Sequence, residues 1–196
     1  MHKHLLWKEE ARALLQRCPI FDLYRSERTG LIAGEGPRSG EFYLLEARDW
    51  VTVVPMVRDA SGRESFLMVR QFRHGIEQVT LEFPAGLVER GEAPQAAARR
   101  ELEEETGHAP GRIERLGTVA AAPAFMTNWC HVHVAWDLRP AGSQSLDETE
   151  VLDLVTVPVD EADGRMGSGE LVNSVTLVSY YFWLRWKGAD RIRTGA

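Results

Sequence analysis

The stretch from Gly86 to His108, GLVERGEAPQAAARRELEEETGH, decides how the rest of this chain is interpreted. It begins as a glycine turn and continues into a predicted helix over residues 94–106. Pro94 suits the first turn of that helix, and Gly107 suits its end. The C-terminal half of the helix carries four glutamates, and at 3.6 residues per turn three of them share one face: Glu101, Glu104 and Glu105.

These three carboxylates repel one another, because like charges three or four residues apart each destabilise a helix by roughly 0.2–0.5 kcal/mol. A sequence that breaks a local rule in this way is more common at a functional site. Oxygen ligands favour Mg²⁺ or Mn²⁺, and magnesium is usually shared between carboxylates and substrate phosphates. The acidic run therefore predicts either a solvated helix face or a site for metal-assisted attack on phosphorus.

Composition excludes several classes of protein. The 196 residues suit one domain, or a domain with a short arm, and 44% apolar with 27% charged residues is typical of a globular protein. A net charge of −6 disfavours nucleic acid and anionic membranes as partners. The two cysteines, Cys18 and Cys130, have no metal spacing and indicate a reducing compartment. Neither a signal peptide nor a membrane span is predicted, so we expect a cytoplasmic protein.

The first 46 residues are predicted to form an arm. Apolar residues in the segment 4–17 recur at the spacing of a short amphipathic helix. Strands are predicted at 18–26 and 41–46, with the Gly/Pro/Ser-rich segment 30–40 as the turn of a hairpin. A hairpin alone is only marginally stable. We therefore expect this arm to pack on the main domain or on a second subunit.

Residues 47–196 are predicted to form the main domain. Strands are expected at 50–58, 64–71, 79–83, 113–121, 130–137 and 151–158, and helices at 94–106 and 174–187, followed by a frayed tail over 188–196. Within the first helix, Ala96, Ala97 and Leu102 are expected to face the core. This mixture predicts an α/β (α+β) fold, with an α/β/α sandwich around a mixed sheet.

The spacing of the glycines, glutamates and arginine is far more specific than the acidic run. It resembles the Nudix box, G-x5-E-x7-R-E-U-x-E-E-x-G-U, in which U is a bulky aliphatic residue. The matching positions are Gly86, Glu92, Arg100, Glu101, Leu102, Glu104, Glu105 and Gly107. Seven specified residues arise by chance at a given position with a frequency of about 10⁻⁸. His108 replaces the last aliphatic residue, and we expect only a packing adjustment there.

The resemblance implies a Nudix-type α/β/α sandwich that binds Mg²⁺, with Mn²⁺ as a substitute. The metal ligands that it implies are the side chains of Glu101 and Glu105 and the backbone carbonyl of Ala85, with Glu104 assisting. It further implies that Arg100 orients a box glutamate, and that Glu92 ties the loop to the helix.

The flanking sequence resembles the ADP-ribose and nucleoside-diphosphate-sugar pyrophosphatase branch of this family. VRQFR, ending at Arg73, and LEFPAG, ending at Gly86, are similar to the branch's lead-in to the box. Pro123 follows Gly107 by 16 residues, where the branch carries a proline. The arm resembles one that such enzymes exchange in a homodimer. Ala124 and Asn128 look closer to nucleoside-diphosphate-sugar hydrolases of the PAF-x-N-N type.

This branch implies roles for residues outside the box. Arg73 would contact a substrate phosphate, and Glu148 would act as catalytic base, with Glu150 as the alternative. Aromatic faces suit nucleobases, so Trp50, Phe21 and Tyr24 are candidates to stack on the base of the substrate, with a place in the core as the alternative for each. The remaining predicted substrate-binding residues are Trp50, Phe21, Tyr24, Pro123 and Asn128.

The sequence therefore predicts a Mg²⁺-dependent pyrophosphohydrolase that splits ADP-ribose or a related nucleotide sugar into a nucleoside monophosphate and a sugar phosphate. One alternative is a house-cleaning hydrolase of (d)NTPs or dinucleoside polyphosphates. A second is a module that binds ADP-ribose without cleaving it. The expected partners are a small nucleotide substrate and a second copy of the chain, with neither nucleic acid nor membrane.

Overall fold

In a computed structural model, which describes residues 3–32 and 36–194, the chain divides into two compact units. The first unit comprises Met1–Arg48 together with Ala120–Trp129, and the second comprises Asp49–Val119 together with Cys130–Ala196. No described helix is both long enough and apolar enough to cross a membrane.

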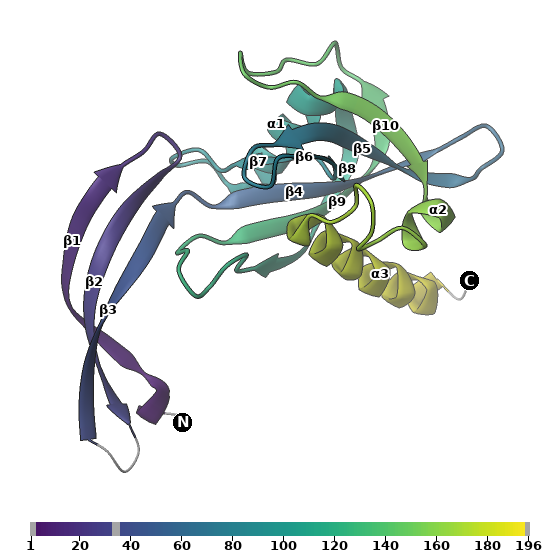
Figure 1. Ribbon diagram of the computed structural model, residues 1–196. Coiled ribbons are helices and arrows are strands. Elements are labelled where there is room, and N and C mark those ends of the chain that lie inside the picture. The colour runs from purple at the N-terminus through teal and green to yellow at the C-terminus, as the bar shows by residue number, and fades with distance from the viewer. Residues whose placement is uncertain (1–2, 33–35, 195–196) are drawn as a thin grey trace. The chain divides into compact units, whose positions relative to one another are not determined.

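The first unit is an antiparallel sheet of three strands, in the order β1-β2-β3 (Figure 1). Its elements are a 3-10 turn η1 (Lys3–Leu5) and the strands β1 (Trp7–Arg17), β2 (Phe21–Ile32) and β3 (Gly36–Ala47). The loop Ala120–Trp129 joins β3 through backbone hydrogen bonds, in which the Leu45 N–H donates to the Phe125 carbonyl at 2.8 Å and the Thr127 N–H donates to the Leu45 carbonyl at 3.1 Å.

The helix expected at 4–17 is wrong, because most of this segment forms β1, which pairs with β2. Cross-strand contacts outweigh the helical pattern: Arg12 bonds Glu46 at 2.7 Å and lies over the Tyr24 ring, 5.3 Å from its centroid. Two register shifts in β1 interrupt the alternation that would have indicated a strand. The expected 30–40 loop is also shorter, because β2 and β3 pair as far as Ile32 and Gly36. Residues 33–35 of that predicted loop lie outside the described residues.

The second unit is a seven-stranded sheet between helices. Its elements are β4 (Trp50–Arg58), β5 (Glu64–Arg73), β6 (Gln78–Glu82), β7 (Ala85–Leu87), α1 (Pro94–Thr106), β8 (His108–Val119), β9 (Cys130–Pro140), β10 (Asp153–Pro158), α2 (Val159–Asp163) and α3 (Ser174–Thr194). The strand order is β10-β5-β4-β9-β8, with β6 beside β5 and β7 beside β4. Only the β4–β9 pairing is parallel among the described strands, so the sheet is mixed.

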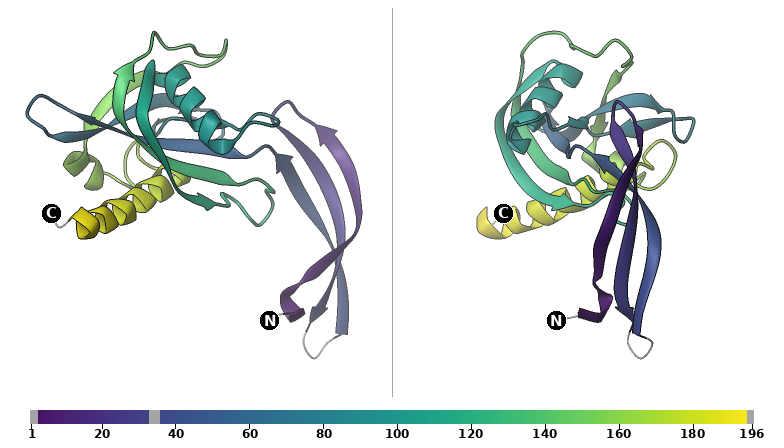
Figure 2. Two further views of the ribbon diagram at one scale, coloured as in Figure 1. Left: turned by 180° about the vertical axis from the view of Figure 1, so that it is seen from behind. Right: turned by 90° about the vertical axis from the view of Figure 1, so that its left-hand side faces the viewer.

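Alternate residues of β4 face two hydrophobic cores. Val53 belongs to the core that α1 completes with Leu102, whereas Val54 belongs to the core that α3 completes with Trp183. This is the period of two expected of a central strand. Figure 2 shows α1 and α3 on opposite sides of the sheet. The predicted fold class, an α/β (α+β) sandwich around a mixed sheet, is confirmed, whereas the N-terminal β-hairpin that was expected is a sheet of three strands.

Two details of the predicted helices are wrong. Ala98, not Ala96, joins Ala97 and Leu102 in the core of α1. At about 100° per residue, Ala96 points away from the arc that holds the buried side chains. The tail expected to fray from residue 188 instead continues α3 as far as Thr194, and residues 195 and 196 lie outside the described part.

Buried His133 on β9 gives a prediction about acid stability. Burial lowers its pKa to about 4, helped by the charges of His131 and Arg115. An unfolded histidine has a pKa of about 6.5. Between these values only the unfolded chain binds the proton, so stability falls as pH drops through this window, by up to about 3 kcal/mol. Urea unfolding at pH 7.5 and 5 should show a loss that is smaller by about 2 kcal/mol in His133→Gln.

The exposed His74 provides the control for this measurement. His74→Gln should lose stability on acidification as the unmodified chain does. If His133→Gln and the unmodified chain lose the same free energy of unfolding between pH 7.5 and 5, His133 is not the source of the acid sensitivity.

Candidate active site

Two glutamates of α1 meet the backbone turn that precedes it. Glu105 is 4% exposed, and its Oε2 accepts a hydrogen bond from the Ala85 N–H at 3.2 Å. A Cβ placed on Gly86 would lie 2.1–2.2 Å from the carboxylate atoms of Glu101. Gly86 is held in place because β7 pairs with the buried strand β4, where it faces Val51. Both carboxylates therefore lie against the Ala85–Gly86 backbone.

The electrostatics of this pair disfavour its charged form. Burial, and then repulsion from Glu101, raises the pKa of Glu105 well above its usual value, although the Ala85 N–H opposes the shift. Burial also raises the pKa of Glu101, against the effect of Arg100. A pair of buried carboxylates that repel each other stabilises a nearby cation.

Arg100 connects the carboxylates to the preceding loop. Its Nε and Nη2 bind the Glu92 carboxylate at 3.1 and 3.0 Å, and Nη2 also donates to the Leu87 carbonyl at 2.9 Å. Its Nη1 donates to Glu101 at 2.8 Å and to Glu104 at 2.9 Å. This hydrogen bonding raises the pKa of Arg100, with Glu92 as the largest cause, and it lowers the pKa of Glu92. The arginine thus fixes one face of Glu101 and closes the loop onto the helix.

Glu104 does not complete a three-carboxylate cage. Its side chain is 41% exposed and bonds Arg100. Within residues 3–32 and 36–194, no three His, Cys, Asp or Glu side chains gather closely enough to hold a metal ion. The expected metal ligation by Glu101, Glu105 and the Ala85 carbonyl, with Glu104 assisting, stays a prediction. The pair of Glu101 and Glu105 fits magnesium, which binds through one or two carboxylates and keeps several waters.

Arg73 forms an ion pair with Glu82, a residue that was not predicted from the sequence. Its Nε and Nη2 form a bidentate pair with Glu82 at 2.8 and 2.6 Å, and Thr80 donates to the same carboxylate at 2.6 Å. Burial alone would raise the pKa of Glu82, but the Arg73 hydrogen bond brings it below the usual value. Thr80 and Glu82 share one face of a short strand whose end is buried. Two polar residues spaced two apart in the otherwise apolar run 79–83 were the pattern in the sequence that could have indicated Glu82 as a functional residue.

The loop after β9 is tied to the end of α1. Gln144 Nε2 donates to the Glu105 carbonyl at 2.6 Å, and the Ser145 N–H donates to the Glu104 carbonyl at 2.8 Å. These bonds satisfy carbonyls that a helix end leaves free, and sequence reasoning missed them too. The loop places Glu150 where its negative charge helps to raise the pKa of both Glu101 and Glu105. Glu148 is exposed and makes no side-chain hydrogen bond with the described residues.

The other predicted substrate residues are divided between the two units. Trp50 is half-buried at the start of β4, opposite Leu87 of β7, so it lies beside the turn. The remaining four belong to the first unit and stay predictions: Phe21, Tyr24, Pro123 and Asn128. There the Asn128 side chain donates to the Arg48 carbonyl at 3.1 Å.

Comparison with known proteins places this chain in a family. The model of the NUDIX domain matches residues 48–175. The match spans well over half of the chain and includes both Glu101 and Glu105. The chain belongs to the Nudix family.

Several curated relatives share this domain. A methanol dehydrogenase activator of Bacillus methanolicus is 34% identical over 123 residues, which cover 62% of this chain and 66% of the relative. An ADP-ribose pyrophosphatase of Bacillus subtilis is 34% identical over 111 residues, with coverage of 56% and 60%. The ADP compounds hydrolase NudE of Escherichia coli is 33% identical over 147 residues, with coverage of 74% and 75%. The chain thus spans less than two thirds of the length of the first two.

A solved structure shows the same fold. The crystal structure of an ADP compounds hydrolase superposes with a TM-score of 0.79, covering 94% of this chain and 96% of that one. Sequence identity between them is 24%, so this likeness supports the fold and not the substrate.

Proposed function

We propose that this protein is a Mg²⁺-dependent hydrolase that splits the diphosphate of ADP-ribose or a related nucleoside diphosphate sugar. The products would be a nucleoside monophosphate and a sugar phosphate. The observation that carries this proposal is the pair of half-buried Glu101 and buried Glu105, set against a glycine that leaves no room for a side chain. The names of the relatives from Bacillus subtilis and Escherichia coli support ADP compounds as substrates.

The proposed metal ligands are the carboxylates of Glu101 and Glu105 and the carbonyl of Ala85, with Glu104 assisting. A bound Mg²⁺, or Mn²⁺ in its place, would neutralise the diphosphate and stabilise charge developing on the leaving phosphate. Arg100 would keep Glu101 in position through its 2.8 Å hydrogen bond. Arg73 would bind a substrate phosphate through its Nη1, because Nε and Nη2 are occupied by Glu82.

A substrate screen with identified products tests the proposal. ADP-ribose, GDP-mannose, ADP-glucose, UDP-glucose, NADH and dNTPs would be incubated with the protein and Mg²⁺. We expect a nucleoside monophosphate and a sugar phosphate from one of the nucleotide sugars. Inorganic pyrophosphate released from a dNTP would favour the house-cleaning alternative. Tight binding of ADP-ribose without any product would favour the binding module.

The catalytic base is proposed to be one of two loop glutamates. The resemblance favours Glu148, but the structure adds support for Glu150, whose charge acts on Glu101, Glu105 and Arg73. We therefore expect Glu150→Gln to lower kcat by about 10²–10⁴-fold, the usual contribution of a general base. Glu148→Gln is the matched comparison and should stay within a few-fold of the unmodified enzyme. The reverse order of the two kcat values would make Glu148 the base.

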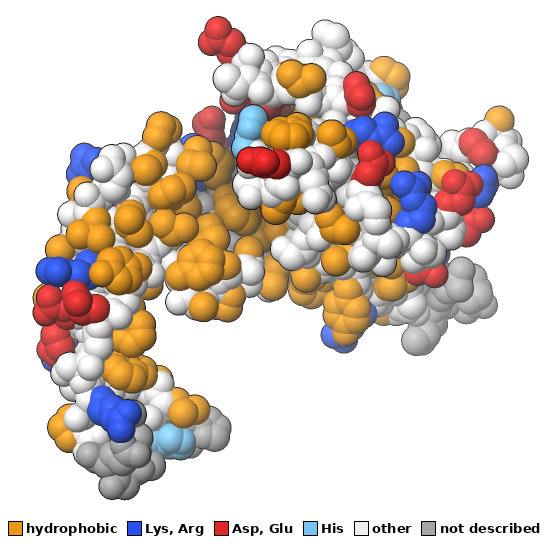
Figure 3. All heavy atoms as spheres, in the orientation of Figure 1, with side chains coloured by type: hydrophobic (Ala, Val, Ile, Leu, Met, Phe, Trp, Pro, Cys, Tyr) orange, Lys and Arg blue, Asp and Glu red, His pale blue; other side chains and the backbone are white. Residues whose placement is uncertain are grey.

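We also propose that residues 1–46 form a dimerisation arm on a hydrolase domain of residues 47–196. The three-stranded sheet leaves several large apolar side chains exposed: Trp7, Leu14, Leu15, Ile20, Leu31, Phe42 and Tyr43. Figure 3 shows hydrophobic side chains gathered over this sheet. An exposed apolar surface of this kind marks an interaction site, and a second copy of the chain would cover it.

Light scattering coupled to size exclusion tests the homodimer. We expect the mass of two chains, and a shift toward one chain when Leu15 and Phe42 are both changed to Glu. If the doubly substituted protein still has the mass of two chains, the arm is not the dimer interface.

The proposed compartment is the cytoplasm, since Cys18 and Cys130 are both free thiols, which suits a reducing environment.

A further inference from the structure

A cavity of about 1330 Å³ lies in the second unit, and none of its lining residues belongs to the Gly86–Gly107 box. Its position follows from the sheet. β4 and β9 pair only from Trp50 and Cys130 to Pro55 and Ala135. Proline has no N–H to donate, so it suits the end of a strand ladder. Beyond it the cavity is lined on one side by Met56–Arg58 and on the other by Trp136–Leu138.

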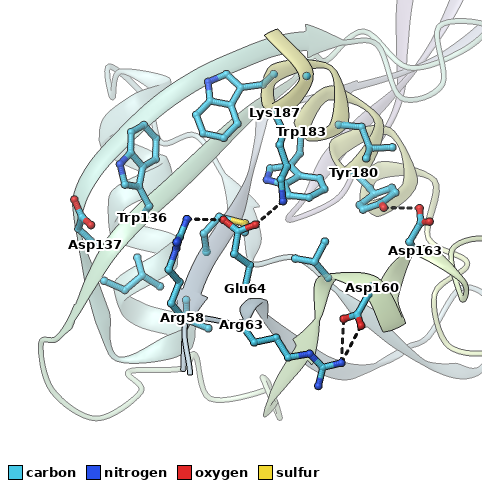
Figure 4. Close-up of a pocket in the computed structure, with 18 residues that line it drawn as sticks. Arg58, Arg63, Glu64, Trp136, Asp137, Asp160, Asp163, Tyr180, Trp183 and Lys187 are labelled. Atoms are coloured by element: carbon cyan, nitrogen blue, oxygen red, sulfur yellow. Dashed lines mark hydrogen bonds and ion pairs between the residues drawn. The ribbon is translucent and has the colours of Figure 1, made fainter. Parts of the chain in front are cut away.

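Aromatic rings from two elements line this opening. Trp136 of β9 and Trp186 of α3 are both half-buried, with ring centroids 5.5 Å apart and planes inclined by 42°. Behind them the rings of Tyr180 and Trp183 are stacked, 5.5 Å apart. Figure 4 shows Trp136, Tyr180 and Trp183 around the cavity, together with the charged groups of its rim. Half-buried aromatic faces suit a planar ring that stacks.

The charges of the rim are already paired with one another. Arg58 and Lys187 both bond Glu64, as the dashed lines in Figure 4 show. Arg63 bonds Asp160 at 3.0 Å and Glu161 at 2.9 Å. The described lining residues include three basic and four acidic side chains, so the cavity carries no excess positive charge. This balance of charge favours an uncharged ligand over a phosphate group.

The rim still offers polar groups to such a ligand. The Arg58 side chain is 68% exposed and uses Nη2 alone in its bond to Glu64, which leaves other N–H groups to donate. Asp137 is half-exposed at the lip, where its Oδ2 lies 3.4 Å from the Arg112 Nε, and its left-handed backbone of φ 56° is one that aspartate adopts more readily than most residues. Gly111 makes room for it, since a Cβ there would lie 2.9 Å from the Asp137 Cβ.

We propose that this cavity is a second binding site, for a neutral nucleoside or its free base, separate from the hydrolytic site. Such a molecule combines a flat ring, which stacks on Trp186 or Trp136, with amino and carbonyl edges. The carbonyl edges accept hydrogen bonds from Arg58, and the amino groups donate to Asp137 or Asp160. The proposal does not depend on the identity of the hydrolysed substrate.

Calorimetric titration of the full chain without metal tests this site, with adenosine, guanosine, cytidine and uridine as probes and AMP as the charged comparison. We expect at least one nucleoside to bind, and AMP to bind no more tightly than adenosine. Trp186→Ala should weaken nucleoside binding by about tenfold to hundredfold, the usual effect of removing a stacking partner. Tyr181→Ala, on the same helix but outside the cavity, should leave the affinity unchanged.

A second variant guards against loss of packing in Trp186→Ala. Leu184 lines the cavity and is 43% exposed, so Leu184→Trp should fill the space without removing a buried side chain. It should abolish nucleoside binding while the thermal midpoint stays near that of the unmodified chain. The proposal is overturned by any of three results: no binding at millimolar nucleoside, AMP binding tenfold more tightly than adenosine, or an affinity that Trp186→Ala and Leu184→Trp leave unchanged.

Discussion

Glu105→Gln is expected to lower kcat by at least about 10³-fold, the scale of losing a group that stabilises transition-state charge. The amide keeps the size of the side chain, and its oxygen still accepts the Ala85 N–H. The change removes the carboxyl group of Glu105, which lies buried beside Glu101. That burial raises the pKa of the carboxyl group well above its usual value. The protein without metal should therefore unfold at an equal or higher temperature, as often occurs when a strained site is neutralised.

Glu103→Gln provides the matched control, because Glu103 lies on the same helix but is exposed. Its kcat should equal that of the unmodified protein. Thermal unfolding with and without Mg²⁺ then separates binding from chemistry. The unmodified chain and Glu103→Gln should gain stability with Mg²⁺, and Glu105→Gln should gain much less. A kcat near normal in Glu105→Gln would remove this residue from the proposed metal site.

The sequence predicted the box region well because its signals are local. Pro94 and Gly107 mark the ends of α1, and the structure has this helix at Pro94–Thr106 with a left-handed φ of 68° at Gly107. The valine-rich run at 50–58 forms β4, which is buried on both faces. Each of these features depends on residues near one another in the chain, where propensity and periodicity are informative.

The features that sequence reasoning missed depend on partners distant in the chain. β1 forms because Arg12 meets Glu46 and Tyr24, and no pattern within residues 4–17 reveals these contacts. The Arg73–Glu82 pair needs the β5–β6 register, in which Arg73 stands opposite Gln78. Gln144 caps α1 from a loop almost 40 residues further along the chain. Such contacts override local preference, and only the fold brings their members together.

Gly86→Ala is expected to separate activity from stability. The added methyl group would lie 2.1–2.2 Å from the Glu101 carboxylate, so that side chain has to move. A displacement of about 1 Å at a catalytic group can cost 10²-fold in rate, and we expect kcat/KM to fall by about that factor. The atom in the way is the flexible end of a side chain. The backbone of β7 can stay paired with β4, and the free energy of unfolding should change by about 1 kcal/mol or less.

Gly75→Ala is the control for this substitution, because a Cβ at Gly75 meets no atom within 4 Å. Its activity and its unfolding midpoint should both match those of the unmodified chain. Mg²⁺ titration followed by thermal unfolding should show weaker metal binding in Gly86→Ala, since a displaced Glu101 can no longer share the cation with Glu105. If Gly86→Ala instead retains full activity and metal affinity, the position of Glu101 against the turn is not what the reaction requires. The same 10²-fold loss accompanied by extensive unfolding would mean that Gly86 serves the pairing of β7 with β4 and not the position of Glu101.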